Sequence, residues 1–125
     1  MTDEPNLARA GGVTYVQIPA VDAEASADFY ERVFGWTIRQ RGTPHVTFAD
    51  GSGHVIGAFI TDRTISREPG ILPYIYVSNI EDAVAAIKTN GGEIVRDIYP
   101  EGALKVATFR DVAGNVMGAW QMGPR

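Results

Sequence analysis

Two stretches of the chain place apolar residues three or four positions apart, which is the spacing of one face of a helix. The first follows Asp22, whose side chain can accept a backbone N–H bond at a helix start, and it stops at Gly35, which tolerates a positive φ. The second follows Ser78-Asn79-Ile80-Glu81, which resembles a capping box, and it stops at Gly91-Gly92. The two apolar stripes are Ala23, Ala27, Tyr30 and Phe34, and Ile80, Ala83, Val84 and Ile87.

The shorter apolar runs predict strands. The candidates are residues 13–19, 36–41, 45–49, 54–61, 72–77, 93–98, 104–110 and 115–121. Asp50-Gly51-Ser52-Gly53 and Asp111-Val112-Ala113-Gly114 predict turns between paired strands, because Asp and Gly favour turns. Each half of the chain therefore runs strand, helix and three strands.

The two halves also repeat one phrase. VTFADGSGHVIGAF, residues 46–59, returns as ATFRDVAGNVMGAW, residues 107–120. We therefore predict an α+β fold in which two βαβββ modules, 12–61 and 70–122, form a curved eight-stranded mixed sheet around a cleft suited to a small ligand. Residues 62–69 would be the linker between modules, and residues 1–11 a flexible N-terminal tail.

Composition narrows the function. The 125 residues suffice for one domain with a real core, and they contain no cysteine, which excludes disulfides and thiolate chemistry. The net charge is -4 and the basic residues are scattered, so nucleic acid is not an expected partner. No apolar run is long enough to cross a membrane, and MTDEPNLARAGG does not resemble a secretory signal. These features predict a cytoplasmic protein with no membrane partner.

Three segments carry a family resemblance: IPAVDAEASADFYERVFGW (18–36), VSNIEDAVAAIKTNGG (77–92) and FRDVAGNVMGAWQ (109–121). The chain resembles the vicinal oxygen chelate superfamily, that is, the glyoxalase/bleomycin resistance/dioxygenase domains. Within this superfamily, the nearest branch looks like the small proteins related to lactoylglutathione lyase. The resemblance implies the duplicated fold, a ligand cleft and a homodimer.

The resemblance also implies four metal ligands, one on the first and one on the last strand of each half. The matching positions hold Tyr15, Gly57, Leu72 and Gly118. Leucine and glycine have no side-chain donor and neutral tyrosine is a poor one, so we expect no metal and no other cofactor. Gln17 could replace one ligand after a register slip. His45 and His54 are interpreted as surface or hairpin residues.

Strand alternation, carried onto the family's cleft, predicts a ligand-binding wall with few polar groups. Its candidate residues are Tyr15, Gln17, Gly57, Phe59, Leu72, Tyr74, Gly118 and Trp120. Alternatively, Phe59, Trp120 and Tyr76 fill the core. The glycines mark either close packing or room for an organic ligand. Arg39, Arg41, Arg96 and Arg110 could bind an anion or lie on solvated strand faces.

We therefore predict a protein that binds a small organic molecule in an aromatic cleft without a metal ion. The alternative is a metal-dependent lyase, isomerase or dioxygenase with displaced ligands. A third hypothesis is a metal-free enzyme that uses Tyr15 or Tyr74 as a proton donor. No residue is assigned a catalytic role.

Overall fold

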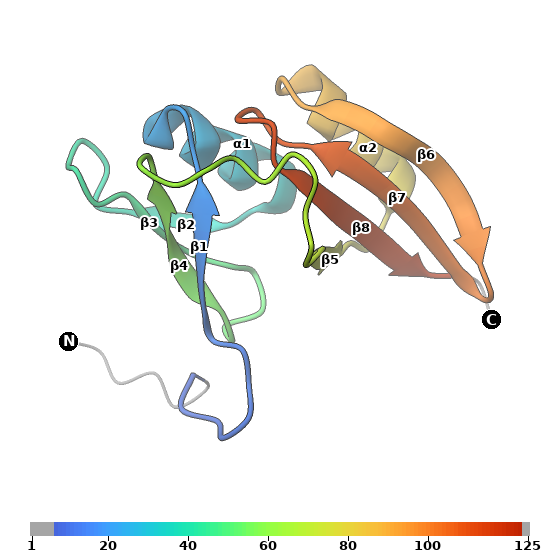
Figure 1. Cartoon of the computed structure of the whole chain (residues 1–125). Coiled ribbons are helices and arrows are strands. Elements are labelled where there is room, and N and C mark those ends of the chain that lie inside the picture. The colour runs from blue at the N-terminus through green and yellow to red at the C-terminus, as the bar shows by residue number, and fades with distance from the viewer. Residues whose placement is uncertain (1–6, 124–125) are drawn as a thin grey trace. The chain divides into compact units, whose positions relative to one another are not determined.

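The computed structural model describes residues 7–123 and divides into two compact units, with the boundary between Arg63 and Thr64 (Figure 1). Each unit is a βαβββ module, as predicted. Each module closes a four-stranded mixed sheet of its own, in place of the single eight-stranded sheet expected. Residues 1–6 of the predicted tail lie outside the described residues. In the part of the chain that is described, no helix is long and apolar enough to cross a membrane.

The first module runs β1 (Tyr15–Pro19), α1 (Ala23–Phe34), β2 (Thr37–Arg39), β3 (Thr47–Ala49) and β4 (Ile56–Ile60). The second runs β5 (Tyr74–Tyr76), α2 (Ile80–Thr89), β6 (Glu93–Glu101), β7 (Leu104–Arg110) and β8 (Val116–Met122). The sheet orders are β1-β4-β3-β2 and β5-β8-β7-β6. In each sheet the first strand of the module pairs parallel with the last, and the other pairs are antiparallel.

The helix ends follow the sequence signals closely. The Asp22 carboxylate accepts the backbone N–H groups of Glu24 and Ala25, and Gly35 ends α1 at φ 73°. In α2 the cap is Asn79, whose side chain accepts the N–H of Asp82, so Ser78 does not take the capping-box role. Capping groups satisfy backbone donors that have no partner within the helix.

Tertiary bonds add to these local ones in the second module. The Gln121 side-chain oxygen accepts the Ile80 N–H at 2.7 Å, which ties β8 to the start of α2. Ser66, in the predicted linker, donates its N–H to the Asn115 side chain and accepts the Val116 N–H. The linker is therefore bound to the β7–β8 hairpin.

The core of the first module is a chain of aromatic rings between α1 and its sheet. Tyr30 of α1 stacks on Trp36 with ring centroids 4.5 Å apart, and Trp36 stacks on Phe48 of β3 at 4.7 Å. Phe59 of β4 completes the cluster at 5.0 Å from Phe48 and 5.8 Å from Tyr30. Phe59 is 2% exposed, so the core alternative holds for this residue.

The core of the second module is mostly aliphatic. α2 packs on β6, β7 and β8 (Figure 1). Its buried residues are Ile80, Ala83, Val84 and Ile87. The sheet meets them with Phe109, Met117 and Ala119, which are all buried. Side chains alternate along a strand, so the neighbours of these three residues on β7 and β8 lie on the face opposite α2, which we call the open face.

The two copies of the repeated phrase close their hairpins differently. In the second module the buried Asp111 carboxylate accepts the N–H groups of Ala113, Gly114 and Asn115, and also the Asn115 side-chain amide. The Asp111 N–H then pairs with the Asn115 carbonyl. In the first module the Asp50 carboxylate accepts bonds from the N–H and hydroxyl groups of Ser52. The Asp50 N–H pairs with the Val55 carbonyl, one residue beyond the position that corresponds to Asn115.

This difference shifts the register by one residue. Thr47 pairs with Ala58, whereas its counterpart Thr108 pairs with Gly118, the counterpart of Gly57. A one-residue slip moves every side chain of a strand to the other face. Gly57 and Phe59 therefore face α1, whereas Gly118 and Trp120 lie on the open face.

We predict that Gly57→Ala and Gly118→Ala differ in cost. A methyl group at Gly57 would press on the Val16 carbonyl and on the Phe48 ring, which is held in the core. At Gly118 it would meet the ring of Tyr74, which is 44% exposed and can rotate away. Overpacking a core typically costs ~1–3 kcal/mol, so Gly57→Ala should lower the free energy of unfolding by at least about 2 kcal/mol and Gly118→Ala by less than about 1 kcal/mol.

Urea unfolding of both variants followed by circular dichroism gives the comparison. Equal losses in the two variants would contradict the difference in register.

Candidate functional site

The open face of the second module carries two rows of paired residues across its four strands. One row runs Tyr74, Gly118, Thr108 and Arg96, and the next runs Tyr76, Trp120, Val106 and Tyr99. Four of these eight residues are aromatic. Val106 lies between Trp120 and Tyr99 in the strand pairing. Its side chain is only 3% exposed, although it does not face α2.

Gly118 gives the Tyr74 ring its place. A Cβ atom at Gly118 would collide with the ring atoms of Tyr74, so the ring lies over the glycine. Glycine inside a strand often marks such close packing. Of the two interpretations of the repeated glycines, close packing therefore applies to both: Gly57 accommodates the Phe48 ring on the helix face and Gly118 accommodates Tyr74 on the open face.

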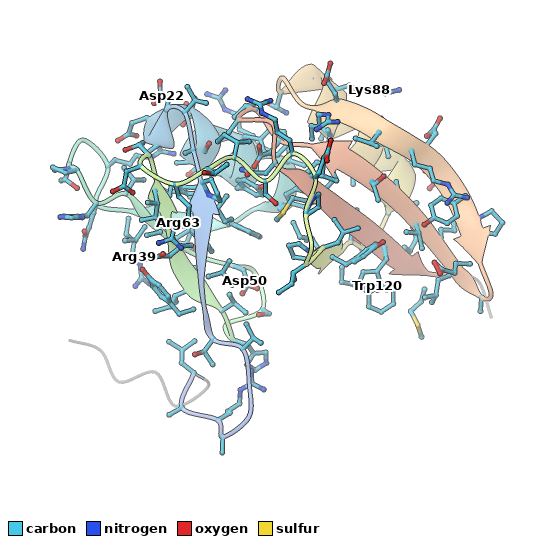
Figure 2. The ribbon with its side chains drawn as sticks, in the orientation of Figure 1. Asp22, Arg39, Asp50, Arg63, Lys88 and Trp120 are labelled. Carbon is cyan, nitrogen blue, oxygen red and sulfur yellow. The ribbon has the colours of Figure 1, made fainter. Side chains whose placement is uncertain are left out.

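Tyr76 and Trp120 form an edge-to-face pair beside Tyr74. Their ring centroids are 4.7 Å apart and the ring planes meet at 81°. Tyr76 is 51% exposed and Trp120 is half-buried, so each ring keeps surface free for another contact. Trp120 projects from β8 (Figure 2). Such amphipathic rings offer a large contact area with polar groups at their edges.

Tyr99 and Arg96 complete the open face at β6. The Arg96 guanidinium carbon lies 3.4 Å from the centroid of the Tyr99 ring. Burial raises the pKa of Tyr74, and the charge and hydrogen bonding of Tyr99 and the charge of Glu101 raise it further, while Arg96 lowers it. The Tyr74 hydroxyl is therefore protonated at neutral pH and can donate a hydrogen bond.

In the first module the candidates separate onto two faces. Tyr15 pairs with Ile56 and Gln17 with Ala58, so Tyr15 and Gln17 share the face opposite α1. Gly57 and Phe59 pair with Val16 and Ile18 and face the helix. The expectation that Gly57 and Phe59 form one wall with Tyr15 and Gln17 is thus corrected, because β4 has the other register.

The remaining candidates have mixed positions. Leu72 precedes β5 and is half-buried, whereas Tyr74, two residues later, is part of the strand. His45 is exposed, and His54 is half-buried at the β3–β4 turn. Within residues 7–123, no three His, Asp or Glu side chains gather closely enough to hold a metal ion.

The family's metal chemistry does not fit the residues at the four ligand positions. Gly57 faces the core and Gly118 is covered by the Tyr74 ring. Leu72 has no donor atom, and the hydroxyl of neutral Tyr15 is a poor ligand.

Sequence reasoning missed the contribution of Tyr99 and treated Arg96 as one of four equivalent strand arginines. The missing signal is non-local. Arg96 and Tyr99 are three positions apart, so in a regular strand they would lie on opposite faces. Register shifts on both sides of Arg96 bring the two onto the same face.

The amino-acid sequence matches the Glyoxalase/Bleomycin resistance protein/Dioxygenase superfamily over residues 12–117. It is 26% identical over 133 residues to the anthracycline biosynthesis protein DnrV of Streptomyces peucetius, an alignment that covers 90% of this chain and 48% of that protein. The chain thus spans about half the length of this curated relative.

Solved structures share the fold. One is a glyoxalase/bleomycin resistance protein/dioxygenase family enzyme from Burkholderia phytofirmans PsJN, with a TM-score of 0.72, 19% identity, and coverage of 87% of this chain and 97% of that one. Another is TnmS3, an antibiotic binding protein from Streptomyces sp. CB03234, with a TM-score of 0.69, 20% identity, and coverage of 90% and 97%. With its two βαβββ modules and this match over most of its length, the chain belongs to the glyoxalase/bleomycin resistance protein/dioxygenase superfamily.

Proposed function

We propose that the protein binds a small, planar organic molecule on the aromatic open face of its second module, without a metal ion. One observation carries the proposal: Tyr74, Tyr76 and Trp120 form a partly exposed aromatic surface built over a glycine. Aromatic surface that stays exposed next to polar groups is typical of ligand sites. The Tyr74 hydroxyl and the Arg96 guanidinium are the polar groups that would orient the ligand.

For the first module taken by itself, Tyr15 and Gln17 remain proposed ligand-contacting residues. They lie on the face opposite α1, and Tyr15 is 53% exposed. Leu72 stays in the proposal as the apolar residue that leads into β5. Gly57 and Phe59 leave it, since both are buried on the α1 side of their sheet.

The relatives favour this class of ligand. DnrV is described as an anthracycline biosynthesis protein, and TnmS3 as an antibiotic binding protein. Anthracyclines contain fused planar rings, which are suited to stacking on tyrosine and tryptophan. We therefore propose an aromatic natural product, such as an antibiotic, as the ligand.

The enzymatic alternatives have less support. A metal-dependent lyase, isomerase or dioxygenase would need ligands displaced from the four usual positions. A metal-free enzyme with Tyr74 as proton donor would need a tyrosine pKa closer to neutral pH, whereas burial and the neighbours of Tyr74 raise its pKa.

Ligand binding is tested by thermal stabilisation with a library of antibiotics and aromatic metabolites that includes anthracyclines. A ligand of the native state raises the melting temperature. For a ligand found in this way, Trp120→Ala and Tyr74→Ala should each raise the Kd about fivefold or more, because stacking on an aromatic ring contributes ~1–3 kcal/mol. His45→Ala, at an exposed position outside the proposed site, is the matched control. Unchanged affinity in both aromatic variants would contradict the proposed site.

The metal-dependent alternative is tested by elemental analysis of protein purified without a histidine tag. The proposed function predicts far less than one equivalent of Ni, Zn, Mn or Fe per chain, and ligand binding that is unchanged by chelator treatment. A stoichiometric metal lost together with ligand binding in the chelator would favour the alternative.

We also propose a homodimer, as the family resemblance implies. A two-fold dimer uses the same surface patch on both subunits. Light scattering should then give twice the chain mass of 13.5 kDa. A monomer at all accessible concentrations would exclude the dimer. The cytoplasmic location expected from the absence of cysteine remains a prediction.

A further inference from the structure

The four strand arginines that the sequence could not separate have different partners. Arg41 forms ion pairs with Glu24, Asp28 and Glu31 of α1, at 2.9 to 3.0 Å. Arg110 donates to the Arg67 carbonyl at 3.4 Å. The guanidinium groups of Arg41 and Arg110 thus already have hydrogen-bond or ion-pair partners within the chain. Arg39 and Arg96 form no ion pair with any residue in 7–123.

Arg39 and Arg96 occupy equivalent places in the two modules. Arg39 follows Gly35 at the same spacing at which Arg96 follows Gly92, and they pair with the equivalent residues Thr47 and Thr108. Both therefore lie on a sheet face opposite a helix, and Arg39 is shown in Figure 2. Their surroundings differ, because Arg96 lies on the Tyr99 ring and no aromatic ring in residues 7–123 lies against the Arg39 guanidinium.

The backbone of β6 creates this difference. The pairs Ile94–Phe109 and Arg96–Thr108 leave one extra residue on β6, and so do the pairs Arg96–Thr108 and Tyr99–Val106. Such bulges re-aim side chains and often lie beside functional sites. Here they bring Arg96 and Tyr99 to one face, which is also the face of Trp120 and Tyr74.

A guanidinium that rests on an aromatic ring is held in place yet keeps N–H groups at its edge. Those donors match the two oxygens of a carboxylate or two of the three oxygens of a sulfonate, and a charge-assisted pair of this kind is stronger than a neutral one. Glu101 lies on the same face, and its negative charge would repel an anionic ligand. The Arg96 donors, however, have no carboxylate partner among the described residues, so Arg96 can attract such a ligand.

We propose that Arg96 is a specificity-determining residue, which makes the open face of the second module select aromatic ligands that carry an anionic oxygen group. The aromatic rings would hold the apolar body of the ligand and Arg96 its anion. This inference rests on the proposed function, and it adds the charge of the ligand.

Two fluorescent probes with the same ring system test the inference. Anilinonaphthalene sulfonate carries an anion, and N-phenylnaphthylamine is the same scaffold without it. Both are titrated into the folded protein and the stoichiometry is measured. The sulfonate should bind about tenfold more tightly at low salt, with one site per chain, and the preference should shrink as salt is added.

Variants then separate charge from stacking. Arg96→Met should weaken the binding of the sulfonate probe about tenfold and change the affinity for the neutral probe by less than about twofold. Arg39→Met, the matched control, should change neither. Glu101→Gln should strengthen the binding of the sulfonate probe, and Trp120→Ala should weaken the binding of both probes. Circular dichroism verifies that each variant is folded.

The outcomes are distinguishable. If neither probe binds at a single site, the proposed function fails and the inference fails with it. If both probes bind equally well, or if Arg96→Met weakens them equally or no more than Arg39→Met does, the inference alone is overturned. Loss of the sulfonate preference in Arg96→Met but not in Arg39→Met supports it.

Discussion

The character of the site depends on how a carboxylate closes one hairpin. Asp111 is buried and holds the backbone of the β7–β8 turn together with the Asn115 amide, so this hairpin closes one residue earlier than its counterpart at Asp50. Because strand side chains alternate, that single residue decides which face β8 presents. Gly118 and Trp120 reach the open face for this reason, whereas Gly57 and Phe59 are part of a core.

The duplication therefore produces two modules that place their aromatic side chains on different faces. In the first, large rings from α1 and the sheet fill the interior, and Gly57 leaves space for Phe48. In the second, Phe109 and smaller or aliphatic residues face α2, whereas Tyr74, Tyr76, Tyr99 and Trp120 lie on the open face. The same glycine thus accommodates a ring in both copies, once to stabilise the protein and once to build a surface that another molecule can contact.

This surface differs in its side-chain chemistry from the four-ligand metal site that the family resemblance implies. The open face of the second module carries ring faces, a protonated tyrosine hydroxyl and a stacked guanidinium. Such groups bind and orient by contact area and directed hydrogen bonds, which suits recognition. The β6 bulges are essential to this arrangement, since they give Arg96 the aromatic support that its counterpart Arg39 does not have.

The sequence by itself determined the local features. Asp22 and Gly35 bound α1, both Asp-containing turns are present, and the βαβββ order follows from periodicity, because these signals act through neighbouring residues. Tertiary structure decided the partnership of Arg96 with Tyr99, through the bulges of β6 in its pairing with β7, and the bonds of Gln121 to Ile80 and of Asn115 to Ser66. Those depend on groups from different strands or from segments far apart in the chain, whereas the hairpin registers depend on turn residues at which the two phrases differ.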